Sequence, residues 1–368
     1  MSLADKKYEK DHLHYLDSAR GIAAMMVLMG HFINWKYQNS ITAKLCSLVF
    51  NANDAVSFFF VLSGFVLSYK YVVQDKSLDI AKYFVNRCAR LFPAFIITVA
   101  LNAIYLYRND LHLKTLSGLF VYNKLEFWEE IYLFRAKSKF FVAGWTLFTE
   151  LTLSFLMPFM IALAKKDRKL ILWLVLTFTL IGGINGFCVH FSLGLLLAAY
   201  FDDIRDISFK KTWFYRYRYL LIVAGYLLFS IRQLDRISPL GSTMRYLMEY
   251  FGLNFFFCTG LGSFIFLAAI LQSPRAQKIL QNKILVFYGR ISYGIYLMHW
   301  LVVVVIFEHW ERIAMHFANN NSAMMVMMLV CIGVSTLLAT ILHYTIELPF
   351  MSYGKKLIKK MKPSLIIP

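Results

Sequence analysis

Ten long apolar segments divide the chain, and they constrain its fold more than any other feature. Most are about 18 to 24 residues long and are separated by charged segments, which is typical of a bundle of membrane-spanning helices and not of a barrel. Hydrophobic residues make up 59% of the 368 residues and charged residues 16%, a balance that excludes a soluble domain of this size. We therefore expect an all-α integral membrane protein with about ten transmembrane helices.

The expected spans differ in length. The third, sixth and seventh are short for a span of about 20 residues. The fifth and sixth meet almost without a loop, so they are either two full spans or one re-entrant hairpin. The ten expected spans lie near residues 18–36, 53–73, 92–107, 141–164, 170–187, 188–202, 218–233, 250–272, 290–307 and 323–346.

Lysine and arginine are distributed unevenly between the two sides of this topology. With the N-terminus inside, 26 of the 39 fall in inner segments and 12 in outer segments, so the positive-inside rule places both termini in the cytoplasm. The formal net charge of +18 then reflects topology and contact with anionic lipids, not nucleic acid. We expect a single membrane domain over 1–368, with a cytoplasmic N-terminal segment (1–17) and a basic cytoplasmic tail (352–368).

Two ionisable residues interrupt the first apolar segment, DSARGIAAMMVLMGHFINW. Arg20 and His31 are eleven residues apart, or three turns plus about 20°, so they share one helix face at a separation of ~16 Å. Glu150 in the fourth segment lies at a depth similar to that of His31. Because ionisable groups inside spans usually face a cavity or a partner, we expect His31 and Glu150 to pair, as a base with its orienting carboxylate or as a structural contact. The alternative is that Arg20 snorkels to the interface and His31 bonds to a neighbouring helix.

A second basic motif, RCAR, precedes the third span. Arg87 and Arg90 are three residues apart and share a face of an expected interfacial helix, which begins at Ser77 and is separated from the span by Pro93. Two interpretations remain open. The pair either clamps phosphate or contacts lipid headgroups.

Polar and small residues recur in two further spans. Ser63 and Gly64 interrupt the second, where small residues usually indicate close helix packing. Tyr293, Tyr296 and His299 follow one another by about one turn in the ninth, where they line a cavity or form a polar packing seam.

Taken together, these motifs resemble the acyltransferase-3 family of bacterial membrane proteins. LDSARGIAAMMVLMGH opens the chain, and FFVLSGF, RCAR with LFPAF, WTLFTE, FSLG and SYGIYLMHW follow in the family's order and spacing. The resemblance covers nearly the whole chain. It implies a multi-pass protein of the bacterial inner membrane that transfers an acyl group to a hydroxyl of an envelope carbohydrate, such as lipopolysaccharide O-antigen. Without the extra extracytoplasmic hydrolase-like domain of some members, a stand-alone enzyme is expected.

The resemblance also implies a donor, which is cytoplasmic acetyl-CoA or another acyl-CoA. Arg87 and Arg90, helped by Arg20, are then expected to hold the nucleotide phosphates at the inner face. Ser63 and Gly64 are expected to line the passage for the long arm that carries the thioester.

The acceptor side is expected to centre on His31 as general base for a sugar hydroxyl, with Glu150 orienting its imidazole. Trp145, Tyr293 and His299 are expected to contact substrate. Direct transfer and an acyl-histidine intermediate both fit these residues.

No metal is expected, because a thioester is already an activated acyl donor. Nor do the five cysteines suggest one, since they form no CxxC pair and lack a histidine at metal-ligand spacing. The expected partners are acyl-CoA, an envelope glycan or lipid-linked oligosaccharide, and membrane lipids. The outer segments 108–140 and 232–249, which include Arg135, Lys137, Arg232 and Arg236, are candidate acceptor contacts because they would face the outer side. A carrier for an anion or a lipid-linked sugar is the alternative function.

Overall fold

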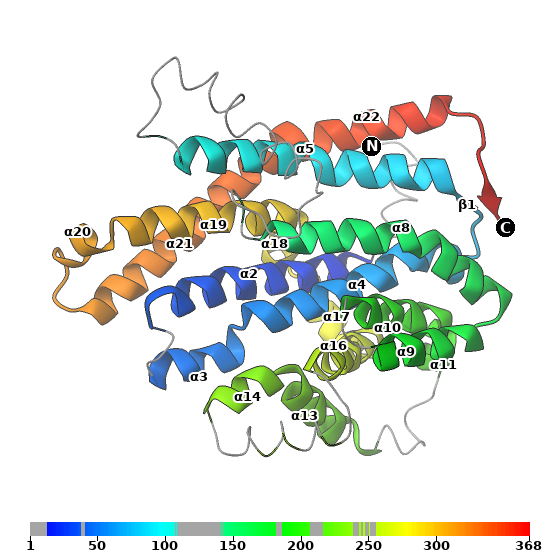
Figure 1. The fold of residues 1–368 in the computed structure, drawn as a ribbon, viewed down its shortest axis with the longest axis horizontal. Helices are drawn as coiled ribbons and strands as arrows, with labels where there is room; N and C mark the ends of the chain where they lie inside the picture. Colours follow the sequence, from blue (N-terminus) through cyan, green and yellow to red (C-terminus); the bar gives the residue numbers. More distant parts are fainter. Residues whose placement is uncertain are drawn as a thin grey trace.

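The computed structural model describes residues 13–37, 41–106, 108, 141, 143–181, 186–206, 216–237, 243, 246, 250 and 255–368. Nearly all of these residues are helical (Figure 1). The helices are α2 (His14–Tyr37), α3 (Ile41–Val49), α4 (Ala52–Val72), α5 (Ile80–Leu106), α8 (Gly144–Lys166), α9 (Lys169–Ile181), α10 (Phe187–Ala199), α11 (Phe201–Asp206), α13 (Arg218–Phe229), α14 (Ile231–Ile237), α16 (Phe255–Gln272), α17 (Pro274–Leu280), α18 (Lys283–Arg290), α19 (Ser292–Glu308), α20 (Trp310–Ala314), α21 (Asn320–Leu342) and α22 (Leu348–Lys360). A π-helical turn, η2 (His343–Glu347), joins α21 to α22, and two short strands are β1 (Leu78–Asp79) and β2 (Ile366–Ile367).

The helix lengths confirm a helical membrane protein but not ten full spans. Among the described residues, 6 helices are long and apolar enough to cross a membrane, or 7 if α18 and α19, which meet at 70°, form one broken span. Every expected span overlaps a helix. However, α9, α10 and α13 have 13, 13 and 12 residues, whereas a span requires ~20. At 1.5 Å per residue each of the three helices is about 18–20 Å long, against ~30 Å for the hydrocarbon core of a membrane.

One expected boundary is wrong, because α5 runs without a break through Pro93. Proline removes a backbone N–H and therefore favours a break. Here the helix continues, and the Tyr293 hydroxyl of α19 donates to the Leu91 carbonyl, two residues before the proline, at 2.8 Å. Nor does the helix begin at Ser77. It begins after Asp79, whose carboxylate accepts the Lys82 N–H at 3.1 Å.

The centre of the bundle is the contact between α4 and α10, which lie side by side in Figure 1. Gly64 and Gly194 make this contact possible. A Cβ at Gly64 would overlap the Phe191 carbonyl, and one at Gly194 would overlap the Val61 carbonyl. Small residues at such contacts let helix backbones approach closely, and they hold α4 in place beneath the polar cavity described below.

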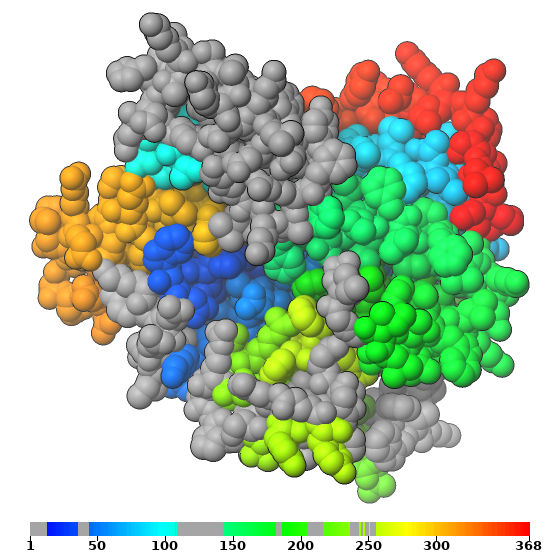
Figure 2. Space-filling model, viewed as in Figure 1, coloured from blue at the N-terminus to red at the C-terminus, as the bar shows by residue number. Residues whose placement is uncertain are grey.

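The C-terminal segment lies against α5 at one edge of the molecule. Figure 2 shows the red atoms of α22 and the chain end beside the cyan and light-blue atoms of α5. Gly354 faces Ala89 across this contact, and β2 pairs antiparallel with β1, with Leu78 opposite Ile367. The N-terminus of the helix that carries Arg87 and Arg90 is thereby fastened to the end of the chain.

Candidate functional site

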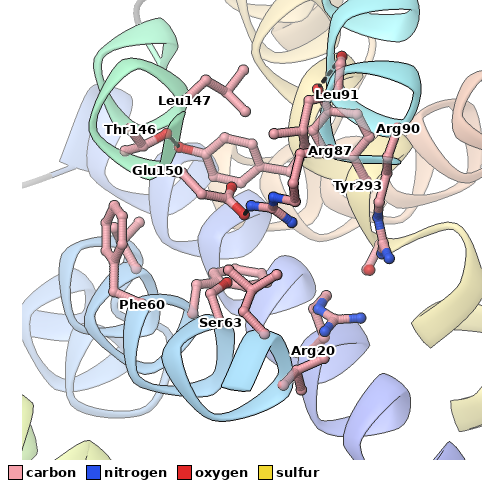
Figure 3. Close-up of a pocket in the computed structure, with 16 residues that line it drawn as sticks. Arg20, Phe60, Ser63, Arg87, Arg90, Leu91, Thr146, Leu147, Glu150 and Tyr293 are labelled. Atoms are coloured by element: carbon pink, nitrogen blue, oxygen red, sulfur yellow. Dashed lines mark hydrogen bonds and ion pairs between the residues drawn. The ribbon is translucent and has the colours of Figure 1, made fainter. Parts of the chain in front are cut away.

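A polar cavity lies between α2, α4, α5, α8 and α19. It encloses roughly 820 Å³ of space not filled by protein atoms, part of it open to solvent. Each of the five helices contributes at least one polar side chain (Figure 3). The principal polar groups are Arg20 on α2, Ser63 on α4, Arg87 and Arg90 on α5, Glu150 on α8 and Tyr293 on α19.

Arg87 and Glu150 form an ion pair in the wall of this cavity. The Arg87 Nη2 lies 2.7 Å from the Glu150 Oε1 and 2.9 Å from the Ser154 hydroxyl. The two charged side chains are 11% and 24% exposed, so water screens the pair only partly. The Ser154 hydroxyl donates to the Glu150 carbonyl at 2.7 Å, and the Tyr83 hydroxyl donates to the Ser154 carbonyl at 3.1 Å. The Arg87 guanidinium is therefore held in one orientation.

This pairing differs from the expected contact between Glu150 and His31. Their similar depth in the membrane follows from helical rise, but depth does not fix which neighbour a helix face meets. The face of α8 that carries Glu150 is turned toward α5, and Arg87 is its partner.

Two further guanidinium groups project into the same cavity (Figure 3). The Arg20 Nη1 lies 3.1 Å from the Asp17 carboxylate, which is not in the lining. The Arg90 guanidinium has no hydrogen-bond or ion-pair partner in the described part of the chain. With three guanidinium groups and the one carboxylate of Glu150, the charged lining favours an anionic ligand.

His31 lies outside this lining, beside a second histidine. The rings of His31 and His299 are stacked, with centroids 5.4 Å apart and an interplanar angle of 22°. Trp300 contacts the edge of the pair, with its ring centroid 5.4 Å from that of His31. The His299 Nδ1 lies 2.7 Å from the Tyr296 carbonyl, so in the neutral ring this nitrogen carries the proton. The His299 Nε2 is buried and has no partner among the described residues.

The other expected site residues separate into two groups. Ser63 and Tyr293 line the cavity, as Arg20, Arg87, Arg90 and Glu150 do. Trp145 and Gly64 do not. The Trp145 ring packs 5.6 Å from the Phe187 ring, and Gly64 faces α10, where its missing side chain serves helix packing.

Ser154 and Thr146 belong to the site but are not predicted from the sequence. Ser154 lies four residues after Glu150 and thus on the same helix face, a spacing that was available as a signal. Of the candidate acceptor contacts, Arg135 and Lys137 lie outside the described residues. The Arg232 guanidinium stacks over the Phe256 ring at 4.5 Å.

The fold and the cavity thus define a helical membrane protein with a buried anion-attracting site. The model of the acyltransferase domain matches residues 13–345, so the chain belongs to the acyltransferase-3 family, and the resemblance of the motifs is confirmed. Membership in a family of acyl-transferring enzymes does not favour the alternative of a carrier.

One curated relative adds to the family match. The chain is 26% identical over 187 residues to nodulation protein 10 of Rhizobium leguminosarum bv. viciae. The match covers 44% of this chain and 48% of that protein, or about half of its length. No solved structure matches the chain.

Proposed function

We propose that the protein transfers an acyl group, acetyl in the simplest case, from acyl-CoA to a hydroxyl of an envelope carbohydrate such as lipopolysaccharide O-antigen. The observation that carries this proposal is the polar cavity of this chain, which belongs to the acyltransferase-3 family. Three guanidinium groups and one carboxylate line this cavity inside a helical membrane bundle. Guanidinium groups bind phosphate through paired hydrogen bonds, and the nucleotide of coenzyme A carries several phosphate charges.

The donor nucleotide binds at Arg90 and Arg20. Arg90 supports this role best, because its guanidinium faces the cavity without a protein partner in the described residues. Arg87 is already bonded to Glu150 and Ser154, so it presents its remaining donors in a fixed direction. The thioester arm runs past Ser63 and Tyr293 toward the histidines.

The membrane orientation follows from the charge distribution. Both termini lie in the cytoplasm of a bacterium and the spans cross its inner membrane, so Arg20 is at the cytoplasmic end of α2 and His31 is nearer the outer surface. At 1.5 Å per residue the two are ~16 Å apart, which allows a donor bound from inside to react with a glycan that arrives from outside.

His31 acts as general base. Its imidazole takes the proton of a sugar hydroxyl as the oxygen attacks the thioester carbonyl, and the carbon–sulfur bond then breaks. The coenzyme A thiolate leaves and receives the proton from the imidazolium, so the products are a carbohydrate ester and free coenzyme A. His299 holds the His31 ring by stacking. A sugar contact at Trp145 is what the family resemblance implies. No metal takes part.

Mass spectrometry of the host's surface polysaccharide tests this function. We expect the ester to disappear when the gene is deleted and to return with the wild-type gene but not with His31→Ala, provided that the variant reaches the membrane in equal amount. Lys165→Ala is the matched control, because Lys165 pairs with Asp75 at the surface and is not part of the cavity lining. An unchanged polysaccharide in the deletion strain would refute the acceptor class.

A further inference from the structure

The polar cavity stops short of the histidine pair. On α19 its lining includes Tyr293 and Tyr296 but not His299, which is one turn further along the helix. On α2 it includes Arg20 but not His31. A thioester that enters beside Arg20 and Arg90 therefore meets a barrier before it reaches the proposed base.

A hydrogen-bonded pair forms this barrier. The Tyr296 hydroxyl lies 2.6 Å from the Thr146 hydroxyl, and the Thr146 hydroxyl donates to the Ala143 carbonyl at 2.8 Å. The Thr146 proton is thus in use, so Tyr296 is the donor in their shared bond. The two residues are 9% and 7% exposed, line the cavity and link α19 to α8.

The Tyr296 ring connects the cavity lining to the histidine pair. Tyr296 lines the cavity, and the centroid of its ring lies 5.7 Å from that of His299, which is not in the lining. The Phe59 ring of α4 completes the contact at 6.0 Å from that of Tyr296. The Tyr296 hydroxyl also lies 3.5 Å from the Ala143 carbonyl, so its side chain is held by neutral hydrogen bonds whose net contribution is small.

We propose that Tyr296 and Thr146 form a gate between the donor cavity and the His31–His299 pair. The gate is closed in this structure and opens when the Tyr296 side chain leaves Thr146. Its role rests on the proposed function, since it separates an activated thioester from water and from the base until the acceptor is in place. The hydrogen-bonded closure itself does not depend on which acyl donor is used.

Accessibility of position 31 tests the gate without any acyl transfer. His31→Cys is reconstituted in vesicles whose Arg20 side faces the medium, and a charged, membrane-impermeant methanethiosulfonate is added. Peptide mapping by mass spectrometry follows modification at position 31 separately from the five native cysteines. If His31→Cys does not assemble, Trp300→Cys reports on the same side of the gate, because Trp300 contacts His31.

We expect Tyr296→Ala to raise the rate of modification at least about tenfold over the same protein with Tyr296. Tyr296→Phe and Thr146→Val, which remove only the hydrogen bond, are expected to raise it about three- to fivefold. Thr98→Val is the matched control, since it removes a buried hydroxyl that bonds to the Ala94 carbonyl outside the cavity lining, and it is expected to leave the rate unchanged. Equal rates with and without Tyr296, or an equal rise in Thr98→Val, would overturn the gate.

Acyl-CoA turnover separates the two proposals. If both the gate and the proposed function are correct, Tyr296→Phe in the otherwise unmodified chain binds acyl-CoA within about twofold of the parent. In the absence of acceptor, this variant hydrolyses acyl-CoA faster than the parent does. A rate of modification that depends on Tyr296 in a protein that never binds acyl-CoA would refute the donor and leave the gate standing. Bound acyl-CoA with a Tyr296-independent rate would refute the gate alone.

Discussion

The ion pair between Arg87 and Glu150 leads to the sharpest prediction. The perturbation is a double-mutant cycle of Arg87→Ala and Glu150→Ala, read out as acyl-CoA affinity by calorimetry on the purified protein. Removing one partner of a fully buried pair costs about 3–5 kcal/mol. The Glu150 side chain is 24% exposed and borders an open cavity, so the pair is not fully buried. Its coupling energy is therefore better estimated from a hydrogen bond to a charged group, which contributes about 1.5–3 kcal/mol.

The expected coupling energy is therefore about 1.5–3 kcal/mol, or roughly tenfold to 150-fold in affinity, because each 1.4 kcal/mol is a factor of ten. Glu150→Ala weakens acyl-CoA binding because it releases Arg87. The acyl-CoA affinity of the double variant is therefore no lower than that of the single variant with the lower affinity. Asp75→Ala with Lys165→Ala is the matched control, since that pair lies at the surface and is expected to show no coupling in acyl-CoA affinity. Additive effects of Arg87 and Glu150 would show that the two act independently and would refute the pair as a positioning unit.

Three further predictions concern the donor, the packing and the C-terminal contact. Arg90→Ala is expected to weaken acyl-CoA binding by about tenfold or more in calorimetry, the cost of one charge-assisted hydrogen bond, and an unchanged affinity would exclude it as a phosphate ligand. Gly194→Ala is expected to lower the unfolding temperature because overpacking costs about 1–3 kcal/mol, whereas Gly333→Ala, where nothing lies within 4 Å of the added Cβ, is expected to be neutral; equal melting of the two would contradict the packing argument. The Ser364 hydroxyl bonds to Asp79 and lowers the pKa of its carboxyl, so ionised Asp79 favours the β1–β2 pairing above its unfolded-state pKa of about 3.9 and the contribution is lost as pH falls through the folded-state pKa. Ser364→Ala is expected to raise the pKa of Asp79 toward 3.9. As the pH is lowered, backbone hydrogen exchange near Asp79 should then lose its protection at a higher pH than in the parent. An unchanged pH profile would contradict the role of Ser364.

Periodicity along single helices was a good guide to the site. The apolar segments predict where the helices lie, and residue spacing predicts the shared face of Arg87 and Arg90, which both line the cavity. The grouping of Arg20 with them is what the family resemblance implies. These predictions succeed because helical rise and rotation are local properties of the sequence. The family resemblance supplies the chemistry that spacing does not.

Contacts between helices were harder to predict, because they depend on how each helix is rotated about its axis. Glu150 has the depth expected for a partner of His31, yet its helix turns it toward Arg87. Gly64 is adjacent to Ser63 in sequence, but a step of 100° turns it away from the cavity and onto α10. Pro93 stays inside α5, although a proline in the sequence favours a break.

Transfer by the purified protein in vesicles tests the central claim most directly. Acyl-CoA labelled in its acyl group is supplied on the Arg20 side and the glycan on the other, and both products are quantified. We expect labelled ester and free coenzyme A to appear in equal amounts, and His31→Ala, folded and still able to bind acyl-CoA, to form neither above background. Movement of the glycan across the membrane without formation of an ester, or full turnover by His31→Ala, would contradict the proposed transfer.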